Sequence, residues 1–152
     1  MNNLLGGATM NRTDESLKAF VGIQRTSETL DRTVRKDSRK HGLNLNEFAV
    51  LELLLNKGPQ PIQQIKEKIL IASSSTTYLI DKLCEKGLVE RIVNEQDRRI
   101  IRASLTPSGK ELIERIFPSH AELIRESFDK LSDDELTQLR FLLKKMNGID
   151  NK

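Results

Sequence analysis

The sequence of 152 residues has few of the residue types that point to a secreted or membrane protein. It contains one cysteine and no tryptophan, and aromatic residues make up only 4%. A single cysteine excludes an internal disulfide framework and a cysteine-based metal site. Its uninterrupted apolar runs are far shorter than the roughly 18 residues of a membrane span. The N-terminus lacks the pattern of a signal peptide, so we expect a cytoplasmic protein with no membrane partner.

Motifs of catalysis and cofactor binding are lacking as well. The sequence has no glycine-rich phosphate loop, nucleophile elbow or acid/base pair, which argues against an enzyme. Its two histidines stand alone, without a carboxylate cluster or an H-E-x-x-H pattern. We therefore expect neither a metal nor a cofactor.

Charged residues, by contrast, are abundant and unevenly distributed. They make up 31% of the chain and give a net charge of +3. Residues 59–110 carry nine basic and six acidic side chains, whereas residues 111–152 are net negative. A basic middle segment indicates a polyanionic partner, although an ordinary solvated surface explains the charge equally well.

Apolar residues recur at helical spacing through most of the chain. Residues 15–40 predict a long amphipathic helix that ends at Gly42. Asn46 is expected to cap a second helix, which is apolar nearly all round and ends at Gly58. Two further short helices follow, the first opened by a proline, and four consecutive hydroxyl residues at positions 73–76 separate them.

The pattern changes after Gly87, where two β-rich runs flank a polar turn. Residues 88–93 and 100–105 predict the two strands of a hairpin. Thr106 is expected to cap a long helix, and Ser132 begins the last helix with a capping box. Two short helices followed at once by a hairpin form a winged helix-turn-helix, whose second helix can lie in a DNA major groove. The predicted fold class is therefore mainly α with a small β-hairpin wing.

Five short motifs give these elements a family resemblance. They are FAVLELL at 48–54, the hydroxyl-rich segment 74–83, KGLV at 86–89, DRR at 97–99 and LTPSG at 105–109. With this order and spacing, the chain from about residue 44 to 109 resembles the MarR family of bacterial transcription regulators. The helices on either side of this segment resemble those of the family less closely. Within the family, the segments 48–54 and 61–83 most resemble the branch that responds to quinones and related electrophiles.

The resemblance implies a homodimer with interleaved helices. It divides the chain into a flexible extension (1–12), a dimerisation helix (13–42), a winged helix-turn-helix DNA-binding domain (43–108) and C-terminal dimerisation helices (109–152). Two such domains would face a palindromic operator with half-sites about 10 base pairs apart. Several leucines would be buried in the dimer, although packing within one chain is the alternative. They are Leu17, Leu131, Leu136, Leu139, Leu142 and Leu143.

The resemblance makes residues 74–83 the recognition helix, which has a core face and an outer face. Periodicity places Thr76, Ile80 and Leu83 on the core face. The residues expected to contact DNA from the outer face are Ser74, Ser75, Thr77 and Tyr78. Relatives often carry arginine at the position of Tyr78, and packing is the alternative role of that side chain.

Other DNA contacts are expected outside this face. Phosphate contacts are expected from Lys82, one turn later, and from Gln63 and Lys66 of the preceding helix. Lys66 could equally be an ordinary solvated side chain. Arg98 and Arg99 lie at the tip of the wing, a thin cationic loop that suits a minor groove. The family resemblance implies that Asp97 holds one of these arginines by an ion pair.

The resemblance also implies a dimeric repressor that a small aromatic, phenolic or quinone-like ligand releases from DNA. Phe20, His41 and Phe48 are candidates for its pocket, although His41 is also explained as a helix-end residue. Cys84 with the nearby Lys86 gives a second hypothesis, a thiol-based redox sensor. Peroxide-sensing relatives usually place their cysteine in the first helix instead. A third hypothesis, a protein-interaction module without an operator, is disfavoured by the two wing arginines.

Overall fold

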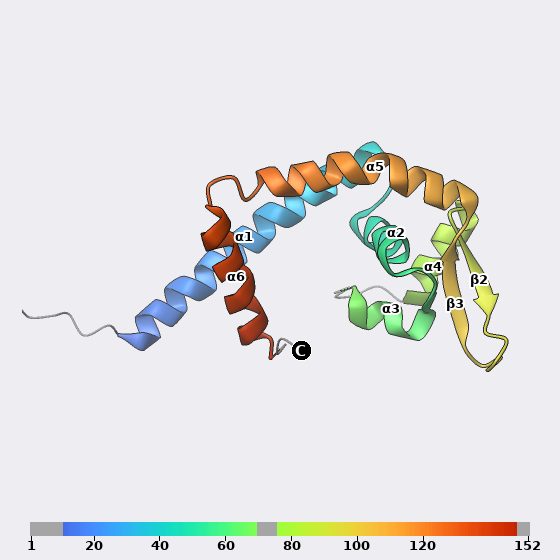
Figure 1. Ribbon diagram of the computed structural model, residues 1–152, viewed down its shortest axis with the longest axis horizontal. Helices are drawn as coiled ribbons and strands as arrows, with labels where there is room; N and C mark the ends of the chain where they lie inside the picture. Colours follow the sequence, from blue (N-terminus) through green and yellow to red (C-terminus); the bar gives the residue numbers. More distant parts are fainter. Residues whose placement is uncertain (1–10, 70–75, 149–152) are drawn as a thin grey trace, which may run out of the picture. The chain divides into compact units, whose positions relative to one another are not determined.

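A computed structural model describes residues 11–69 and 76–148, which are mainly helical with one small antiparallel sheet (Figure 1). In chain order the elements are α1 (Arg12–Lys40), α2 (Leu45–Lys57), β1 (Gln60–Pro61), α3 (Ile62–Lys68), α4 (Thr76–Glu85), β2 (Val89–Val93), β3 (Ile101–Leu105), α5 (Pro107–Glu126) and α6 (Asp133–Met146). This order confirms the predicted fold class. The chain forms two compact units, one up to Thr33 and one from Val34 onward. Within the described ranges, no helix has the length and apolarity that a membrane span needs.

The part of α1 in the first unit is an exposed amphipathic helix. Asp14 and Glu15 lie in its first turn, where acidic side chains interact favourably with the helix dipole. Its apolar side chains are open to solvent, and Leu17 and Phe20 are 58% and 59% exposed. A stripe of this kind is typical of a surface that another chain or segment covers.

The cap of α2 differs from the prediction, because Asn44 and not Asn46 occupies the N-cap position. The side chain of Asn44 accepts a hydrogen bond from the amide of Glu47 at 2.8 Å. The carboxylate of Glu47 in turn accepts one from the amide of Asn44 at 3.0 Å. Only Asn44 stands three residues before an acidic residue, the spacing that a capping box requires, whereas Asn46 lies within the first turn.

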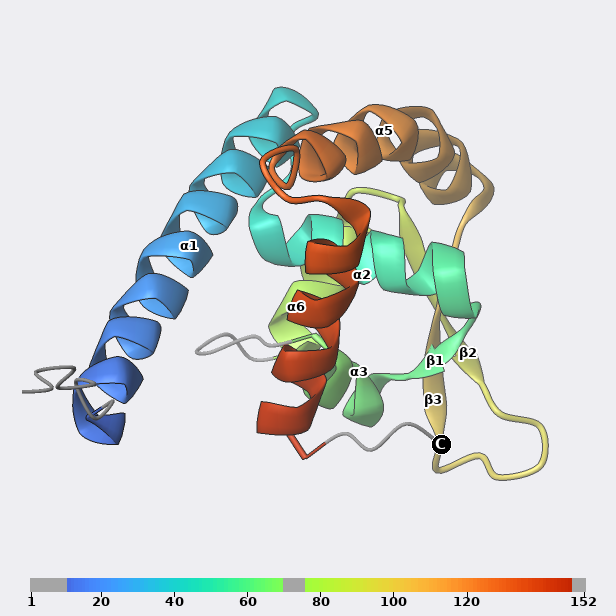
Figure 2. The same cartoon turned by 60° about the vertical axis from the view of Figure 1, so that its left-hand side comes forward.

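In the second unit α2 lies between α5 and α3 (Figure 2), and its residues Phe48, Val50, Leu51 and Leu54 belong to the hydrophobic core. α2 packs against α5, α4 and β3, and α3 packs against α4. The core takes its largest fully buried apolar side chains from all four of these helices: Phe48, Leu51, Ile65, Ile80, Leu83 and Ile113. Each contributes roughly 1.5–3 kcal/mol through burial. The short helices α3 and α4 are thus anchored through their inner faces, and their outer faces stay open.

A strand that the sequence did not predict precedes α3. Gln60 and Pro61 form β1, which pairs antiparallel with Ala103 and Arg102 of β3, so the sheet order is β1-β3-β2. Pro61 was expected to open the helix, but its backbone is extended and α3 begins at Ile62. Proline is tolerated here because β1 lies at the edge of the sheet.

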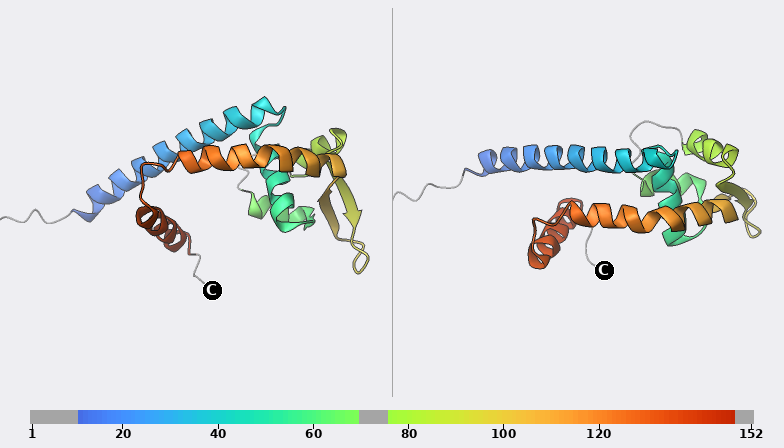
Figure 3. Two further views of the ribbon diagram at one scale, coloured as in Figure 1. Left: turned by 45° about the horizontal axis from the view of Figure 1, so that its top comes forward. Right: turned by 90° about the horizontal axis from the view of Figure 1, so that it is seen from above.

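β2 and β3 form the predicted hairpin, which extends away from the helices of the second unit (Figure 3). Val89 pairs with Leu105 at its base, and Val93 pairs with Ile101 further out. Of the residues of β2 only Val89 is buried, so the outer half of the hairpin is a two-stranded ribbon exposed to solvent.

The turn from β3 into α5 packs closely on the base of the hairpin. Thr106 caps α5, as predicted: its hydroxyl accepts a hydrogen bond from the amide of Gly109 at 3.0 Å. The same hydroxyl donates to the carbonyl oxygen of Gly87 at 2.6 Å. Gly109 is buried so closely against Leu88 that a Cβ atom would lie 1.9 Å from the carbonyl oxygen of Leu88. These contacts hold the wing against the start of α5.

α6 has the predicted capping box but no buried residue. Ser132 accepts a hydrogen bond from the amide of Glu135, whose carboxylate accepts one from the amide of Ser132. Leu142 and Leu143 remain 47% and 39% exposed. The helix is therefore well formed locally, while its apolar side chains lack a covering surface in the described chain.

Candidate nucleic-acid interface

α4 presents an outer face to solvent and an inner face to the core. Leu79, Ile80 and Leu83 are buried, and Thr76 is half-buried. Thr77 is exposed, and Tyr78 is 60% exposed although it is a large aromatic residue. The sequence did not single out Leu79 as a core residue. Ser74 and Ser75, also expected to contact DNA, lie outside the described residues.

Two side chains of the outer face interact with each other. The ammonium group of Lys82 lies 5.4 Å from the ring centre of Tyr78, a cation–π contact. Lys82 also donates to Glu85 at 3.0 Å, and this hydrogen bond raises the pKa of Lys82. The lysine therefore stays protonated, and its charge lies beside the exposed tyrosine ring.

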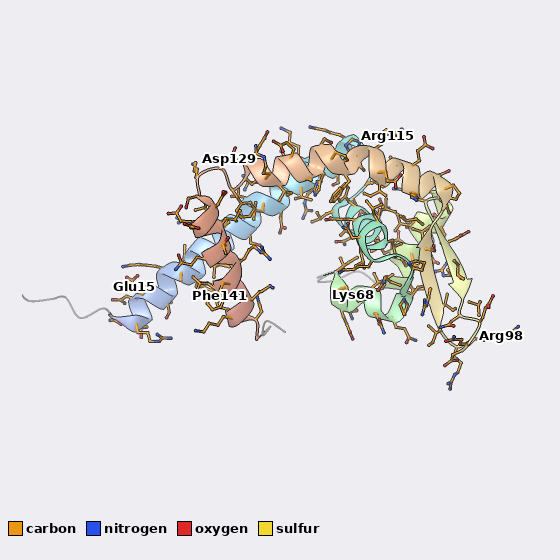
Figure 4. The ribbon with its side chains drawn as sticks, viewed as in Figure 1. Glu15, Lys68, Arg98, Arg115, Asp129 and Phe141 are labelled. Carbon is orange, nitrogen blue, oxygen red and sulfur yellow. The ribbon has the colours of Figure 1, made fainter. Side chains whose placement is uncertain are left out.

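α3 exposes the two side chains that the sequence proposed for phosphate contacts. Gln63 and Lys66 are exposed, while Ile65 between them is fully buried. Lys68, which Figure 4 labels on the same helix, donates a hydrogen bond to Gln60 of β1. The helix thus carries its polar groups on the side away from the core.

The tip of the wing contains an ion pair between two of the three residues of the DRR motif. Arg99 donates through Nε and a terminal nitrogen to the carboxylate of Asp97, at 3.0 and 3.1 Å. The backbone amide of Arg99 donates to the same carboxylate at 3.1 Å. These hydrogen bonds lower the pKa of Asp97. Arg98 forms no ion pair in the described part of the chain, and Figure 4 shows it at the far end of the hairpin.

Cys84 and Lys86 do not form the pair that the redox hypothesis invoked. The ammonium group of Lys86 donates to the buried carboxylate of Glu47 at 2.8 Å and to the carbonyl oxygen of Gly42 at 3.0 Å. It therefore connects the end of α4 to the start of α2. The sulfur of Cys84 is half-buried, and the nearest guanidinium nitrogen of Arg91 is 3.7 Å away.

The three candidates for an effector pocket lie in different environments. Phe48 is 1% exposed in the core, and its ring centre is 4.2 Å from that of His120. His41 is half-buried just after α1. Phe20 is exposed and belongs to the first unit. Their grouping into one pocket stays a prediction.

Sequence reasoning missed a buried polar pair next to Phe48. His120 of α5 and Asp37 of α1 are both buried, with 3.0 Å between the imidazole Nδ1 and the carboxylate. The residues are 83 positions apart, so neither local spacing nor periodicity could connect them. The sequence indicates this pair only through a polar residue on the buried side of each helix, Asp37 in α1 and His120 in α5.

Comparison with known proteins links this arrangement to one family. The sequence profile of the MarR family matches residues 43–101. The HTH-type transcriptional regulator MhqR of Bacillus subtilis (strain 168) is 45% identical over 140 residues, or 92% of this chain and 96% of that protein.

Two solved structures share the fold. A cysteine-to-serine mutant of MarR from E. coli, complexed with operator DNA, has a TM-score of 0.76 at 24% identity and covers 90% of this chain and 98% of its own. BpsR of Bordetella bronchiseptica, whose DNA binding is described as regulated by 6-hydroxynicotinic acid, has a TM-score of 0.73 at 23% identity and covers 84% and 91%. The chain therefore belongs to the MarR family, and it is a transcription regulator and not an enzyme.

Proposed function

We propose that the protein is a homodimeric repressor that binds a palindromic operator with its winged helix-turn-helix, residues 43–108. α4 lies in the major groove, where Thr77 and Tyr78, with Ser74 and Ser75, contact base edges and nearby phosphates. The wing tip with Arg98 and Arg99 enters the adjacent minor groove, whose negative potential attracts arginine. The observation that carries this proposal is a core-anchored helix with an open outer face beside a projecting hairpin that ends in arginine.

Backbone contacts orient the protein on the duplex. Gln63 and Lys66 of α3, and Lys82 of α4, bind phosphates on either side of the recognition helix. Asp97 holds Arg99 in place through the ion pair at the wing tip, and Arg98 and Arg99 both contact DNA there. This division of roles is supported by the exposure of Gln63 and Lys66 and by the two hydrogen bonds between Arg99 and Asp97.

A second copy of the chain covers the exposed apolar stripes of residues 13–42 and 109–152. Each large apolar side chain gains roughly 1.5–3 kcal/mol on full burial, so the stripes together favour association. The leucines that bury in this interface are Leu17, Leu131, Leu136, Leu139, Leu142 and Leu143. Two-fold symmetry then places two recognition helices about one turn of DNA apart.

A small aromatic, phenolic or quinone-like ligand releases the repressor from its operator. The likeness to the electrophile-responsive branch supports this ligand class. The regulation described for BpsR by a small aromatic acid supports it at the level of the fold. Phe20, His41 and Phe48 are the side chains that we propose for contact with this ligand. Residues 1–10 of the expected N-terminal extension lie outside the described residues, and Arg12, the last residue assigned to it, begins α1.

Footprinting on the upstream region of the protein's own gene tests this function. We expect two protected half-sites about 10 base pairs apart, and loss of protection when a reactive quinone such as benzoquinone is added. Cys84→Ser is the matched variant: release that persists in it excludes thiol sensing, and release that is lost would favour the redox hypothesis. Absence of any symmetric footprint would contradict the proposed function.

A further inference from the structure

An acidic residue lies on the outer face of the recognition helix, where it faces away from the core. Asp81 follows Tyr78 by three residues and its side chain is 49% exposed. An unpaired carboxylate at this position would repel the phosphates of bound DNA. Its charge is balanced by Arg91 of β2, which donates a hydrogen bond from a terminal nitrogen to the Asp81 carboxylate. The other terminal nitrogen of Arg91 lies 3.7 Å from the sulfur of Cys84.

The register of the hairpin explains why Arg91 reaches α4. Arg91 pairs directly with Ala103, which is fully buried, and paired residues point to the same face of a sheet. Arg91 is therefore on the core-facing side of the hairpin. The next residue on that side toward the base is the buried Val89, and the next toward the tip is the exposed Val93. Arg91 thus occupies the place where the wing leaves the core.

We infer that Arg91 is a positioning residue that sets the angle of the wing relative to the recognition helix, with Asp81 as its anchor. This inference rests on the proposed DNA-binding function and assigns a role within the same site. The guanidinium of Arg91 contacts two groups about one turn apart on α4, the carboxylate of Asp81 and the sulfur of Cys84. A contact with two points resists tilting more than a contact with one point.

A small tilt of the hairpin at Arg91 produces a larger displacement at the tip of the wing. Arg98 lies in the turn, roughly 15 Å beyond Arg91 at the usual rise of about 3.3 Å per strand residue. A tilt of roughly 10° at the base would then move the tip by roughly 3 Å, enough to separate hydrogen-bonding groups. Beyond Val89, every residue of β2 is exposed, so side-chain packing gives the outer hairpin little other support.

The direction in which Asp81→Ala changes the Kd for operator DNA distinguishes this inference from a simple charge effect. Removal of a negative charge that faces DNA should strengthen binding by electrostatics alone. Loss of the anchor should weaken it, and we expect a 3- to 10-fold higher Kd on operator DNA. Glu85→Ala is the charge control, because it removes the same charge from the same helix, and the side chain of Glu85 interacts with Lys82 of that helix, which the variant releases to contact phosphate. We expect its Kd to be unchanged or lower.

The variant Arg91→Ala tests whether Arg91 positions the wing or contacts a DNA phosphate. Loss of a phosphate contact reduces the slope of log K against log salt concentration by about 0.9 per protomer. We expect the Kd to rise 3- to 10-fold with the slope unchanged, and the double variant Asp81→Ala/Arg91→Ala to bind no more weakly than either single variant. A shallower slope, or additive losses in the double variant, would overturn the inference.

Hydrogen exchange in the DNA-free protein completes the test and does not depend on an operator. The amide of Asn94 donates to the carbonyl oxygen of Ile100 at the outer end of the hairpin, at 2.9 Å. We expect this amide and those of β2 and β3 to exchange faster in Asp81→Ala than in Glu85→Ala. Equal exchange in both variants would overturn the positioning role of Arg91. Failure of the wild-type protein to bind operator DNA would instead contradict the proposed function.

Discussion

The turn where the wing meets α5 has no space for a side chain at Gly109, so Gly109→Ala is a direct test of the packing. An alanine Cβ would lie 1.9 Å from the carbonyl oxygen of Leu88 and 2.8 Å from its carbonyl carbon. Both are main-chain atoms, and the oxygen also accepts a hydrogen bond from the amide of Thr106 at 3.1 Å. Relief of the overlap therefore requires that the start of α5 and the base of the wing move apart.

Two effects of this substitution oppose each other. In an unconstrained helix, alanine is more favourable than glycine by about 0.5–1 kcal/mol. Over-packing of a buried position costs about 1–3 kcal/mol, and more where the main chain has to move. The second effect is larger here because the obstructing atoms cannot rotate away. We expect the free energy of unfolding to fall by roughly 1–3 kcal/mol.

Denaturant unfolding at one protein concentration measures this change, since the stability of a dimer depends on concentration. Ser108→Ala is the matched control, because Ser108 is exposed in the same helical turn. Its free energy of unfolding should change by no more than about 0.5 kcal/mol. If Gly109→Ala leaves the protein equally stable or makes it more stable, the close approach of Gly109 to Leu88 is refuted.

Other parts of the protein give two further predictions. Phe48→Ala should lower the free energy of unfolding by about 3–5 kcal/mol, because it removes a fully buried ring; a loss below about 1 kcal/mol in denaturant unfolding would contradict its place in the core. The carboxyl of Asp97 should titrate below its ordinary pKa of 3.8, because Arg99 hydrogen-bonds to its charged form. The ion pair is then present above the ordinary pKa and is lost as the pH falls through the lowered value. An NMR titration of this carboxyl at or above 3.8 would contradict the ion pair.

The features that the sequence predicted depend mainly on local interactions. The Thr106 cap, the Ser132 capping box and the hairpin after Gly87 each involve residues close together in the chain, so their spacing is visible in the sequence. The misplaced cap of α2 was also local: two asparagines compete, and only Asn44 has the capping-box spacing to Glu47. A full count of that spacing would have identified it.

The features that the sequence did not predict depend on tertiary contacts. β1 has two residues, too few to show a period, and exists because β3 offers an edge for pairing. The link between Lys86 and Glu47 joins residues 39 positions apart. The pairing of Arg91 with Asp81 follows from the hairpin register, which sets the face of β2 that carries Arg91. Each requires the assembled fold.

The affinity of Arg98→Ala for the footprinted operator, measured over a range of salt concentrations, tests the central claim most directly. If the wing carries Arg98 into the minor groove, binding should weaken by about 1–3 kcal/mol and depend less steeply on salt. Arg102→Ala, on a strand of the same hairpin, controls for loss of one positive charge. An Arg98→Ala protein with wild-type affinity and salt dependence would contradict the account of the wing as a DNA-binding element.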